Sequence, residues 1–509
     1  MNFAVNFLRE IFQKNKNKIF ITCSITDKEL TYNDLEILAL KLANFLSKKG
    51  IKKGDKISII LPNCIEYIVI YFACMQLGAI AVPINYKLSI QEIKKILLQI
   101  NSDFLFISST FKDSFAEINS LVDQIFYFVP SCDFKNNLDT NFLRDILLEE
   151  KKYSENSFSD IKDLDTLAIV FTSGTTSMPK GIVISYKNII SNALAFIKEV
   201  ELTPDLKFFN ILDLAYLGGF YNLTLIPLLA QGSIVLSKTF DPQVAIYFWA
   251  QIIKYKINSL WLVPSIISIL LQIDRSDGAC NYSKKNIKKV LVGTAPLAKK
   301  LQEAFEQKYL VKLYENYGLS ETFFISTNSY KQNECLGVGR IISGCEVFIF
   351  DENKNILEFN QVGEIAVKSV YKNKYFGNEN LESELFFTGD IGYLDSNGHL
   401  FITDRKKDLI IRGGINISPK EIEDIILNYP NIKEVAVIGL PDDYMGEKIV
   451  VVINSDGNIS EFDIKRYCKN FLAAFKIPTD IVFMKNLPKS VTGKIQKNFL
   501  KESLLREQR

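Results

Sequence analysis

Short β-branched runs alternate with longer helical patterns through the first 300 residues of this chain, and this alternation constrains its fold more than any other feature. Residues 56–61, 103–107 and 289–292 are apolar and have the length of buried strands. Residues 92–100 and 298–308 carry apolar side chains at helical spacing. Such alternation is typical of parallel sheets covered by helices. The sequence therefore predicts an α/β fold for this region.

The pattern changes after about residue 325, where turn-forming clusters follow one another more closely. Residues 351–354 and 395–398 combine Asp, Asn, Ser and Gly between short strand-like runs. Turns at this spacing favour hairpins. We therefore expect a small, more antiparallel β unit between residues 325 and 403.

A domain boundary is predicted near Lys406. Beyond it, Ser418 opens a segment with capping-box spacing and proline at the first helical position. Strands are expected at 434–440 and 448–453, followed by a helix over 461–471. About a hundred residues suffice for an independent α+β domain.

These patterns together predict an α/β protein of two domains. Residues 1–406 would form a large N-terminal domain of two βαβ-type subdomains plus a small β-barrel-like unit, and residues 407–509 a small C-terminal domain. A chain of 509 residues is too long for a single core, which agrees with this division.

Charge and cysteine usage exclude several classes of protein. The 60 basic and 58 acidic residues nearly balance, so the chain offers no electrostatic footprint for nucleic acid. Eight cysteines lie scattered without a C-x-x-C pair, and with a single histidine they predict no zinc site. Free thiols favour a reducing compartment, and we expect a cytoplasmic protein. The first ten residues lack the basic start and apolar core of a secretion signal.

Residues 67–84 are almost wholly apolar and long enough to suggest a membrane span. Gln76 lies inside this segment, and Gly78 and Pro83 interrupt it. A buried helix to Leu77 followed by a strand over 79–82 explains it better. We therefore predict no transmembrane segment.

The segment FTSGTTSMPKG, residues 171–181, combines closely spaced hydroxyls, two glycines and a lysine after an apolar strand. Free backbone N–H groups, hydroxyl donors and a cation are what a polyphosphate requires. A Walker loop needs glycine directly before the lysine and Ser or Thr after it. Here Pro179 precedes Lys180 and Gly181 follows it, so the loop belongs to another phosphate-binding family.

Further motifs follow in order along the chain: GTAPL at 293–297, YGLSET at 317–322, FTGD at 387–390, DRKKD at 404–408, GGINISPKE at 413–421 and PKSVTGK at 488–494. This ordered set resembles the adenylate-forming (ANL) superfamily, which includes acyl- and aryl-CoA synthetases, adenylation domains of peptide synthetases and firefly luciferase. The resemblance runs from about Leu30 to about Leu500. It implies an ATP-dependent carboxylic acid ligase.

The resemblance also implies roles for individual residues. The catalytic set would be Lys494, Glu321, Thr172 and Lys180, with Glu321 as the ligand of Mg²⁺. Tyr317 would stack on adenine, Asp390 would accept the ribose hydroxyls, and Arg405 would lie nearby. The implied ATP- and AMP-binding residues are Thr172, Ser173, Gly174, Thr175, Thr176, Lys180, Gly293, Thr294, Ala295, Pro296, Tyr317, Gly318, Ser320, Asp390, Arg405 and Lys494.

Two positions depart from the family pattern or from expectation. Ser177 stands where the family usually has glycine, which costs stability if that backbone needs a positive φ. The single histidine, His399, follows Asn397-Gly398 and is interpreted as a turn residue.

Adenylate formation suits a chain with a single histidine. A carboxylate is already ionised at neutral pH, since carboxyl pKa values lie near ~4. Pyrophosphate leaves as a stable anion, so no general base is needed. The protein's task is to neutralise and orient phosphate charge.

The resemblance further implies a second half-reaction on a thiol. The C-terminal domain would be mobile, with Lys407 at the hinge and Gly413 and Gly414 lining a thiol tunnel. The implied cofactors and partners are ATP, Mg²⁺, a small-molecule carboxylic acid and coenzyme A, or a phosphopantetheinyl acyl carrier protein in place of CoA.

Residues 214–220 bear on which acid is activated. Amino-acid-activating relatives carry an aspartate where ungapped matching places Gly218, although a shifted register would bring Asp213 there. An α-ammonium without that anion would be buried unpaired, which is costly. The expected pocket residues are Tyr216, Gly218, Phe220, Phe323 and Phe324.

An apolar pocket of this kind favours a fatty or aryl acid. Three alternatives remain open: a free-standing adenylation enzyme that loads a carrier protein, a luciferase-type oxygenase, and a non-catalytic binding protein of the same fold.

Overall fold

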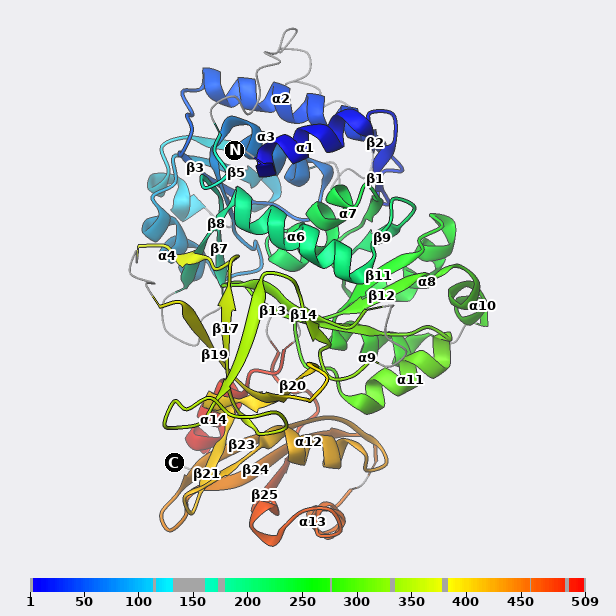
Figure 1. Ribbon diagram of the computed structural model, residues 1–509, viewed down its shortest axis with the longest axis vertical. Coiled ribbons are helices and arrows are strands. Elements are labelled where there is room, and N and C mark those ends of the chain that lie inside the picture. Colours follow the sequence, from blue (N-terminus) through cyan, green and yellow to red (C-terminus); the bar gives the residue numbers. More distant parts are fainter. Residues whose placement is uncertain are drawn as a thin grey trace.

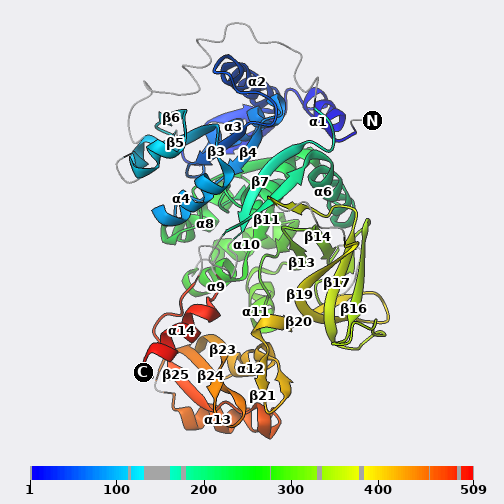
Figure 2. The same cartoon turned by 90° about the vertical axis from the view of Figure 1, so that its left-hand side faces the viewer.

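The computed structural model describes residues 3–112, 116–130, 161–172, 179–274, 277–329, 335–377, 383–457, 459–489 and 494–507. Figures 1 and 2 show a large N-terminal body of sheets and helices with a small C-terminal domain at one end. The predicted α/β class and its division into a large and a small part are confirmed. The exact boundary at residues 406 and 407 falls in the short helix η5 (Lys406–Asp408) and stays a prediction.

The first sheet has seven strands and is parallel at its centre. Its strands in spatial order are β18 (Lys374–Tyr375), β8 (Lys180–Ser185), β7 (Thr166–Thr172), β4 (Ile80–Pro83), β3 (Lys56–Ile60), β5 (Phe104–Ser108) and β6 (Ile125–Phe128). The β7–β8 and β8–β18 pairs are antiparallel, and the other pairs are parallel. The chain therefore turns back on itself directly after β7.

The second sheet has nine strands, and the two at one of its edges, β1 and β2, come from the N-terminal part of the chain. In spatial order they are β15 (Arg340–Ile341), β14 (Phe323–Thr327), β13 (Tyr314–Leu319), β12 (Lys289–Val292), β11 (Ser259–Leu262), β9 (Lys207–Asn210), β10 (Ser233–Leu236), β1 (Ile19–Cys23) and β2 (Glu29–Thr31). β1 lies parallel to β10, with Ile21 opposite Ile234. The two large sheets are therefore interleaved in sequence.

Helices cover these two sheets (Figure 1). They are α1 (Phe3–Lys14), α2 (Tyr32–Lys48), α3 (Ile65–Leu77), α4 (Ile90–Ile100), α6 (Tyr186–Val200), α7 (Ile226–Leu229), α8 (Pro242–Lys254), α9 (Pro264–Ile273), α10 (Asp277–Asn286) and α11 (Lys299–Tyr309). Short helical turns complete the large domain: η1 (Ser109–Phe111), η2 (Ala116–Leu121) and the π-helix η4 (Gly218–Leu225).

The local sequence explains where several helices begin. Thr31 and Asp34 form a reciprocal capping box at the start of α2, and Ser89 and Glu92 do the same for α4. α3 is buried on every side up to Gln76, as predicted for the apolar segment. No helix in the described ranges has the length and hydropathy needed to cross a bilayer.

The small β unit is a four-stranded antiparallel sheet (Figure 2). Its order is β16 (Cys345–Phe350), β17 (Gly363–Ser369), β19 (Leu385–Leu394) and β20 (Leu400–Arg405). The outer strands β16 and β20 do not pair with each other in the described part of the chain, so the sheet is open rather than a closed barrel. Its last strand leads directly into the small domain.

The C-terminal domain is α+β, as predicted. Its sheet contains β21 (Ile410–Arg412), β22 (Ile415–Ile417), β23 (Ile432–Asp442), β24 (Gly446–Ser455) and β25 (Asp480–Phe483). Its helices are α12 (Pro419–Leu427), α13 (Glu461–Cys468), η6 (Ala474–Lys476) and α14 (Lys497–Glu507). The predicted helix over 461–471 ends earlier, at Cys468.

The capping box expected at Ser418 forms only in part. Ser418 Oγ accepts the Glu421 N–H at 3.2 Å, but the Glu421 carboxylate instead forms an ion pair with Lys476. The Ser418 hydroxyl itself donates to Asp404 of β20 at 2.6 Å. The start of α12 is thereby tied to the large domain.

Further hydrogen bonds join the two domains in this arrangement. Lys420 Nζ donates to the Ile402 carbonyl at 3.0 Å, and Lys300 Nζ donates to the Leu427 carbonyl at 2.6 Å. Each of these bonds uses a long, adaptable lysine side chain and a backbone acceptor. Such contacts hold one domain orientation without a large apolar interface.

Candidate functional site

The phosphate-binding loop predicted from the sequence connects β7 to β8. Thr172 and Lys180 are the last residues paired across these antiparallel strands, so the loop leaves and returns at the same edge of the first sheet. Ser173, Gly174, Thr175, Thr176 and Ser177 lie outside the described residues. The structure places the two ends of the loop side by side.

Tyr375 connects Lys180 to Glu321. The Lys180 ammonium lies 5.6 Å from the centre of the Tyr375 ring, and the Tyr375 hydroxyl donates to Glu321 Oε1 at 2.9 Å. Burial and the Glu321 carboxylate raise the pKa of Tyr375, so it remains a hydrogen-bond donor at neutral pH. The two catalytic candidates are therefore joined through a residue that the sequence analysis missed.

The backbone that carries Glu321 is held by asparagines. The Asn373 N–H donates to the Glu321 carbonyl at 2.8 Å, and Asn373 Nδ2 donates to the Ser320 carbonyl at 3.0 Å. Asn188 Nδ2, from α6, donates to Asn373 Oδ1 at 3.2 Å. These bonds fix the turn between β13 and β14 on which the carboxylate is presented.

Asp390 lies buried between Tyr317 and Arg405. The Tyr317 hydroxyl donates to Asp390 Oδ2 at 2.6 Å, and Arg405 Nε contacts Asp390 Oδ1 at 2.8 Å. Asp390 and Arg405 are direct partners across β19 and β20, which explains their proximity. Burial and the carboxylate raise the pKa of Tyr317, which keeps its hydroxyl protonated. Each carboxylate oxygen retains lone pairs for a further donor.

Lys494 comes from the small domain, just before α14, and faces the same cluster. Its pKa is lowered because desolvation and the charge of Arg405 disfavour the ammonium, while Asp390 favours it. Lys407 interacts with both Asp390 and Arg405, and desolvation lowers its pKa as well. Two lysines of the small domain therefore lie within electrostatic range of the buried carboxylate of the large domain.

Gly293 follows directly after β12 and packs closely against Asn316. Any side chain at Gly293 would overlap the side chain of Asn316, so the backbone must stay bare here. Thr294 adopts a φ of 71°, in the left-handed region. Asn316 Nδ2 is buried and has no hydrogen-bond partner in the described part of the chain. Ala295 and Pro296 continue the same loop, which fits the predicted nucleobase position.

Glu315 precedes Asn316 in β13 and was not identified from the sequence. Desolvation raises its pKa to about 7, although the Lys420 ammonium and the Leu297 N–H both favour the charged form. The Leu297 N–H donates to Glu315 Oε1 at 3.4 Å. Its position near the start of β13, two residues before Tyr317, is the signal that could have found it.

The residues predicted to line the acid pocket are mostly packed in an aromatic cluster. Phe220 stacks on Tyr71 with ring centres 3.5 Å apart, and Phe324 stacks on Phe196 at 4.1 Å. Phe323 lies 5.1 Å from Tyr221 and has a φ of 57°, which is rare for a bulky residue. The three predicted phenylalanines are thus buried core residues in this structure.

The beginning of the η4 segment is more open. Tyr216 and Gly218 are half-buried, in contrast to the phenylalanines. Asp213 accepts hydrogen bonds from Asn85 Nδ2 at 3.0 Å and from the Ala215 N–H at 2.9 Å. Its carboxylate is therefore already engaged within the protein.

Gly413 and Gly414 form the turn between β21 and β22, with φ values of 58° and 79°. A Cβ at Gly414 would meet open space, whereas one at Gly413 would press on Met445.

The predicted turn residue His399 is buried, and its ring forms hydrogen bonds with Asp395 at 2.9 Å and with Arg340 at 3.3 Å. His399 is thus structural, as the sequence indicated.

Glu321 could hold Mg²⁺ only as one ligand among several. No group of three or more His, Cys, Asp or Glu side chains within the described ranges could enclose a metal ion. Mg²⁺ usually binds one or two carboxylates together with phosphate oxygens and water. The single half-buried carboxylate of Glu321 near a phosphate loop fits that mode. The cysteines in the described part are free thiols.

Two family models match the chain. The AMP-binding enzyme model covers residues 8–371, and the AMP-binding enzyme C-terminal domain model covers residues 421–494. The chain is 28% identical to the long-chain-fatty-acid–CoA ligase FadD13 of Mycobacterium tuberculosis, covering 94% of this chain and 93% of that one. It is also 28% identical to the crotonobetaine/carnitine–CoA ligase of Proteus mirabilis, covering 97% of each.

Solved structures agree with these matches over the whole length. ATP-bound MatB from Rhodopseudomonas palustris superposes with a TM-score of 0.90 at 27% identity, covering 100% of both chains. The apo form of the same protein gives a TM-score of 0.78. Over the whole chain the structure therefore superposes better on the ATP-bound form than on the apo form.

Proposed function

This chain belongs to the adenylate-forming superfamily of AMP-binding enzymes, and from that premise we propose how its site works. The enzyme activates a carboxylic acid with ATP to acyl-AMP, releasing pyrophosphate, and then transfers the acyl group to a thiol. Coenzyme A is the acceptor that its relatives' names indicate.

The observation that carries the assignment is that Lys494 of the small domain lies within electrostatic range of Asp390, which Tyr317 and Arg405 contact directly. These residues come from different domains, yet their charges influence one another. Asp390 would accept the ribose hydroxyls, since it keeps unused lone pairs beside Tyr317 and Arg405. Lys494 would then lie near the α-phosphate, where negative charge grows as the carboxylate attacks.

At the other end of the triphosphate, the β7–β8 loop and Lys180 would hold the β- and γ-phosphates. Tyr375 orients Glu321 by its hydrogen bond to Oε1, leaving the second carboxylate oxygen for a hard cation. Mg²⁺ bound there would neutralise phosphate charge. Glu321, in the turn between β13 and β14, and Lys180, at the start of β8, would thus bind the same phosphates.

The acid is proposed to have an uncharged tail, fatty or aryl. Asp213, the only nearby anion considered for a substrate ammonium, already accepts two hydrogen bonds within the protein. Gly218 offers no charge in its place. An amino acid would therefore lose the hydration of its ammonium without gaining a partner.

The test is pyrophosphate release across a panel of fatty, aryl and amino acids, with Lys494→Ala and the exposed-lysine control Lys485→Ala. We expect release with fatty or aryl acids, lost in Lys494→Ala and kept in the control. Thioester is then measured with CoA and with a phosphopantetheinylated carrier protein. Exchange with amino acids alone would refute the acid class, and thioester on the carrier alone would favour a free-standing adenylation enzyme.

A further inference from the structure

The buried carboxylate of Asp404, at the end of β20, accepts a hydrogen bond that most helices of this kind keep to themselves. In α2, α4 and α13, the hydroxyl of the N-cap residue donates to a carboxylate three residues further along the same helix, at 2.7, 2.7 and 2.5 Å. α12 has the same spacing, with Ser418 at the N-cap and Glu421 three residues later. Its hydroxyl nevertheless donates to Asp404 of the large domain at 2.6 Å.

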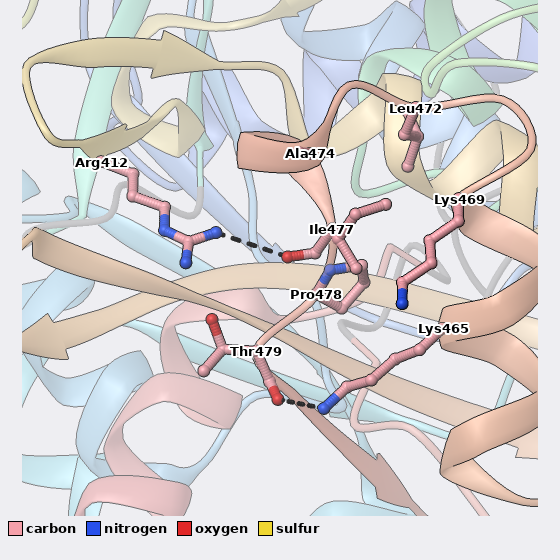
Figure 3. Close-up of a pocket in the computed structure, with 8 residues that line it drawn as sticks. All are labelled: Arg412, Lys465, Lys469, Leu472, Ala474, Ile477, Pro478 and Thr479. Carbon is pink, nitrogen blue, oxygen red and sulfur yellow. Dashed lines mark hydrogen bonds between the residues drawn. The ribbon is translucent and has the colours of Figure 1, made fainter.

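The local carboxylate of α12 is already engaged by a lysine. Lys476 Nζ lies 2.7 Å from both carboxylate oxygens of Glu421. Lys476 is the last residue of η6, and the backbone that follows it is fixed because Arg412 Nη1 donates to the Ile477 carbonyl at 3.4 Å (Figure 3). The N-cap hydroxyl of α12 is thus left to the carboxylate of β20.

Asp404 caps α12 with more than one bond. Its Oδ2 accepts the Ser418 hydroxyl and also the Lys420 N–H at 3.2 Å, while its Oδ1 accepts the Arg405 N–H at 2.8 Å. A carboxylate beside the first N–H groups of a helix is favoured by the positive end of the helix dipole. Hydrogen bonds to an ionised acceptor are also stronger than neutral ones. The large domain therefore supplies the capping charge of a helix in the small domain.

This contact spans the joint between the domains. Asp404 precedes and Ser418 follows the short helix η5, where the two domains connect. A rotation of the small domain about this joint would move the hydroxyl away from the carboxylate. The lysine contacts described above use long side chains that adapt to a changed orientation. Asp404 and Ser418 have short side chains, so their bond tolerates little change.

A continuous path leads from this cap to Lys494. Glu423 of α12 forms an ion pair with Lys497 of α14 at 2.7 Å, and Lys494 lies three residues before Lys497. On the other side of the joint, Asp404 directly precedes Arg405, which contacts Asp390. The cap therefore joins the two parts of the chain that bring Lys494 and Asp390 within electrostatic range of each other.

We propose that Asp404 is a positioning residue for acyl-AMP formation. By accepting the Ser418 hydroxyl, it holds the small domain in the arrangement that places Lys494 near Asp390. The inference rests on the proposed function, in which Lys494 acts while the α-phosphate is attacked. Thioester formation from acyl-AMP does not use Lys494 in that scheme, so it does not depend on the cap.

The experiment measures both half-reactions in single turnovers, with acyl-AMP supplied for the second. We expect Ser418→Ala to slow acyl-AMP formation about tenfold, the size of one charge-assisted hydrogen bond, and to leave thioester formation at least as fast as in wild type. Ser418→Thr keeps a hydroxyl and should restore most of the lost rate. Asp404→Asn should also slow acyl-AMP formation, and its effect should not multiply with that of Ser418→Ala, because both changes weaken the same bond.

Ser460→Ala is the matched control. Ser460 caps α13 in the same domain, and its Oγ accepts the Asp463 N–H at 3.2 Å, as Ser418 Oγ accepts the Glu421 N–H. Its hydroxyl donates within its own helix, so this change removes a cap without touching the joint. Both half-reactions should keep their wild-type rates.

Three results would overturn the role of Asp404: an unchanged rate of acyl-AMP formation in Ser418→Ala, an equal slowing of both half-reactions, or the same loss in Ser460→Ala. Lys494→Ala separates this failure from a failure of the proposed function. If Lys494→Ala loses acyl-AMP formation and Ser418→Ala does not, the positioning role alone is wrong. If Lys494→Ala keeps the wild-type rate, the proposed role of the lysine is wrong, and the positioning role falls with it.

Discussion

Replacing Glu315 by glutamine tests the electrostatics of the buried region beside Asn316 and Leu297. Burial raises the pKa of this carboxyl from 4.5 to about 7. The folded protein therefore binds the proton more tightly than the unfolded chain, so stability is complete below about pH 4.5 and falls as the pH rises towards 7. Each tenfold change in proton affinity is worth about 1.4 kcal/mol, so the wild type should lose roughly 3 kcal/mol of unfolding free energy across that window.

Glutamine keeps an acceptor for the Leu297 N–H and cannot ionise, so Glu315→Gln should lack this decline. The assay is urea denaturation of both proteins at pH values from 5 to 8. The difference in unfolding free energy should grow in favour of the variant by roughly 3 kcal/mol and level off above pH 7. Glu303→Gln, an exposed change on α11, is the matched control and should follow the wild type.

Lys420 supplies an internal check, because its ammonium favours the charged form of Glu315. Lys420→Met should extend the decline to higher pH when Glu315 is present, and this extension beyond pH 7 should be absent in Glu315→Gln, where only the weaker effect of Lys420 on Asp424 remains. Parallel stability curves for wild type and Glu315→Gln between pH 5 and 8 would refute the raised pKa.

Three further predictions concern catalysis. Lys494→Ala should reduce acyl-AMP formation by at least ~10³-fold but spare thioester formation from supplied acyl-AMP, because the lysine matters only while the α-phosphate is attacked. Single-turnover assays measure each half-reaction, and a loss of thioester formation from supplied acyl-AMP would contradict this role. Gly414→Leu should show the reverse pattern in the same assays, since a larger side chain at this open turn obstructs the thiol; equal damage to both steps contradicts it. Tyr375→Phe removes the hydrogen bond that orients Glu321 and should raise the magnesium concentration needed for half-maximal pyrophosphate release. An unchanged magnesium dependence would mean that the carboxylate is positioned by other contacts.

The sequence predicted those parts of the fold that depend on local pattern. The apolar helix up to Leu77, the strands around β3 and β5 and the α+β domain follow from periodicity and turn residues. Partner strands distant in sequence leave no such pattern. The pairing of β1 with β10 joins residues 21 and 234, and nothing local in either strand indicates it.

The same distinction between local motifs and distant pairings separates the site residues that the sequence predicted from those that it missed. Asp390, Arg405 and Glu321 stand in recognisable motifs, and the structure brings the first two together across a strand pair. Tyr375 could not be found, because its role depends on a two-residue strand pairing with β8. The phenylalanines expected in the acid pocket are instead packed in the core. Aromatic character alone does not distinguish a residue of a pocket wall from a residue of a packed core.

The position of β1 has a consequence for the way the protein is made. Chains emerge at roughly 5–20 residues per second, so the ribosome delivers β10 some 10–40 s after β1. Until then the hairpin of β1 and β2 has an open edge of unpaired N–H and C=O groups, the kind of surface that recruits other strands. The second sheet therefore closes only after translation has passed Leu236, and the N-terminal strand needs protection from intermolecular pairing throughout that interval.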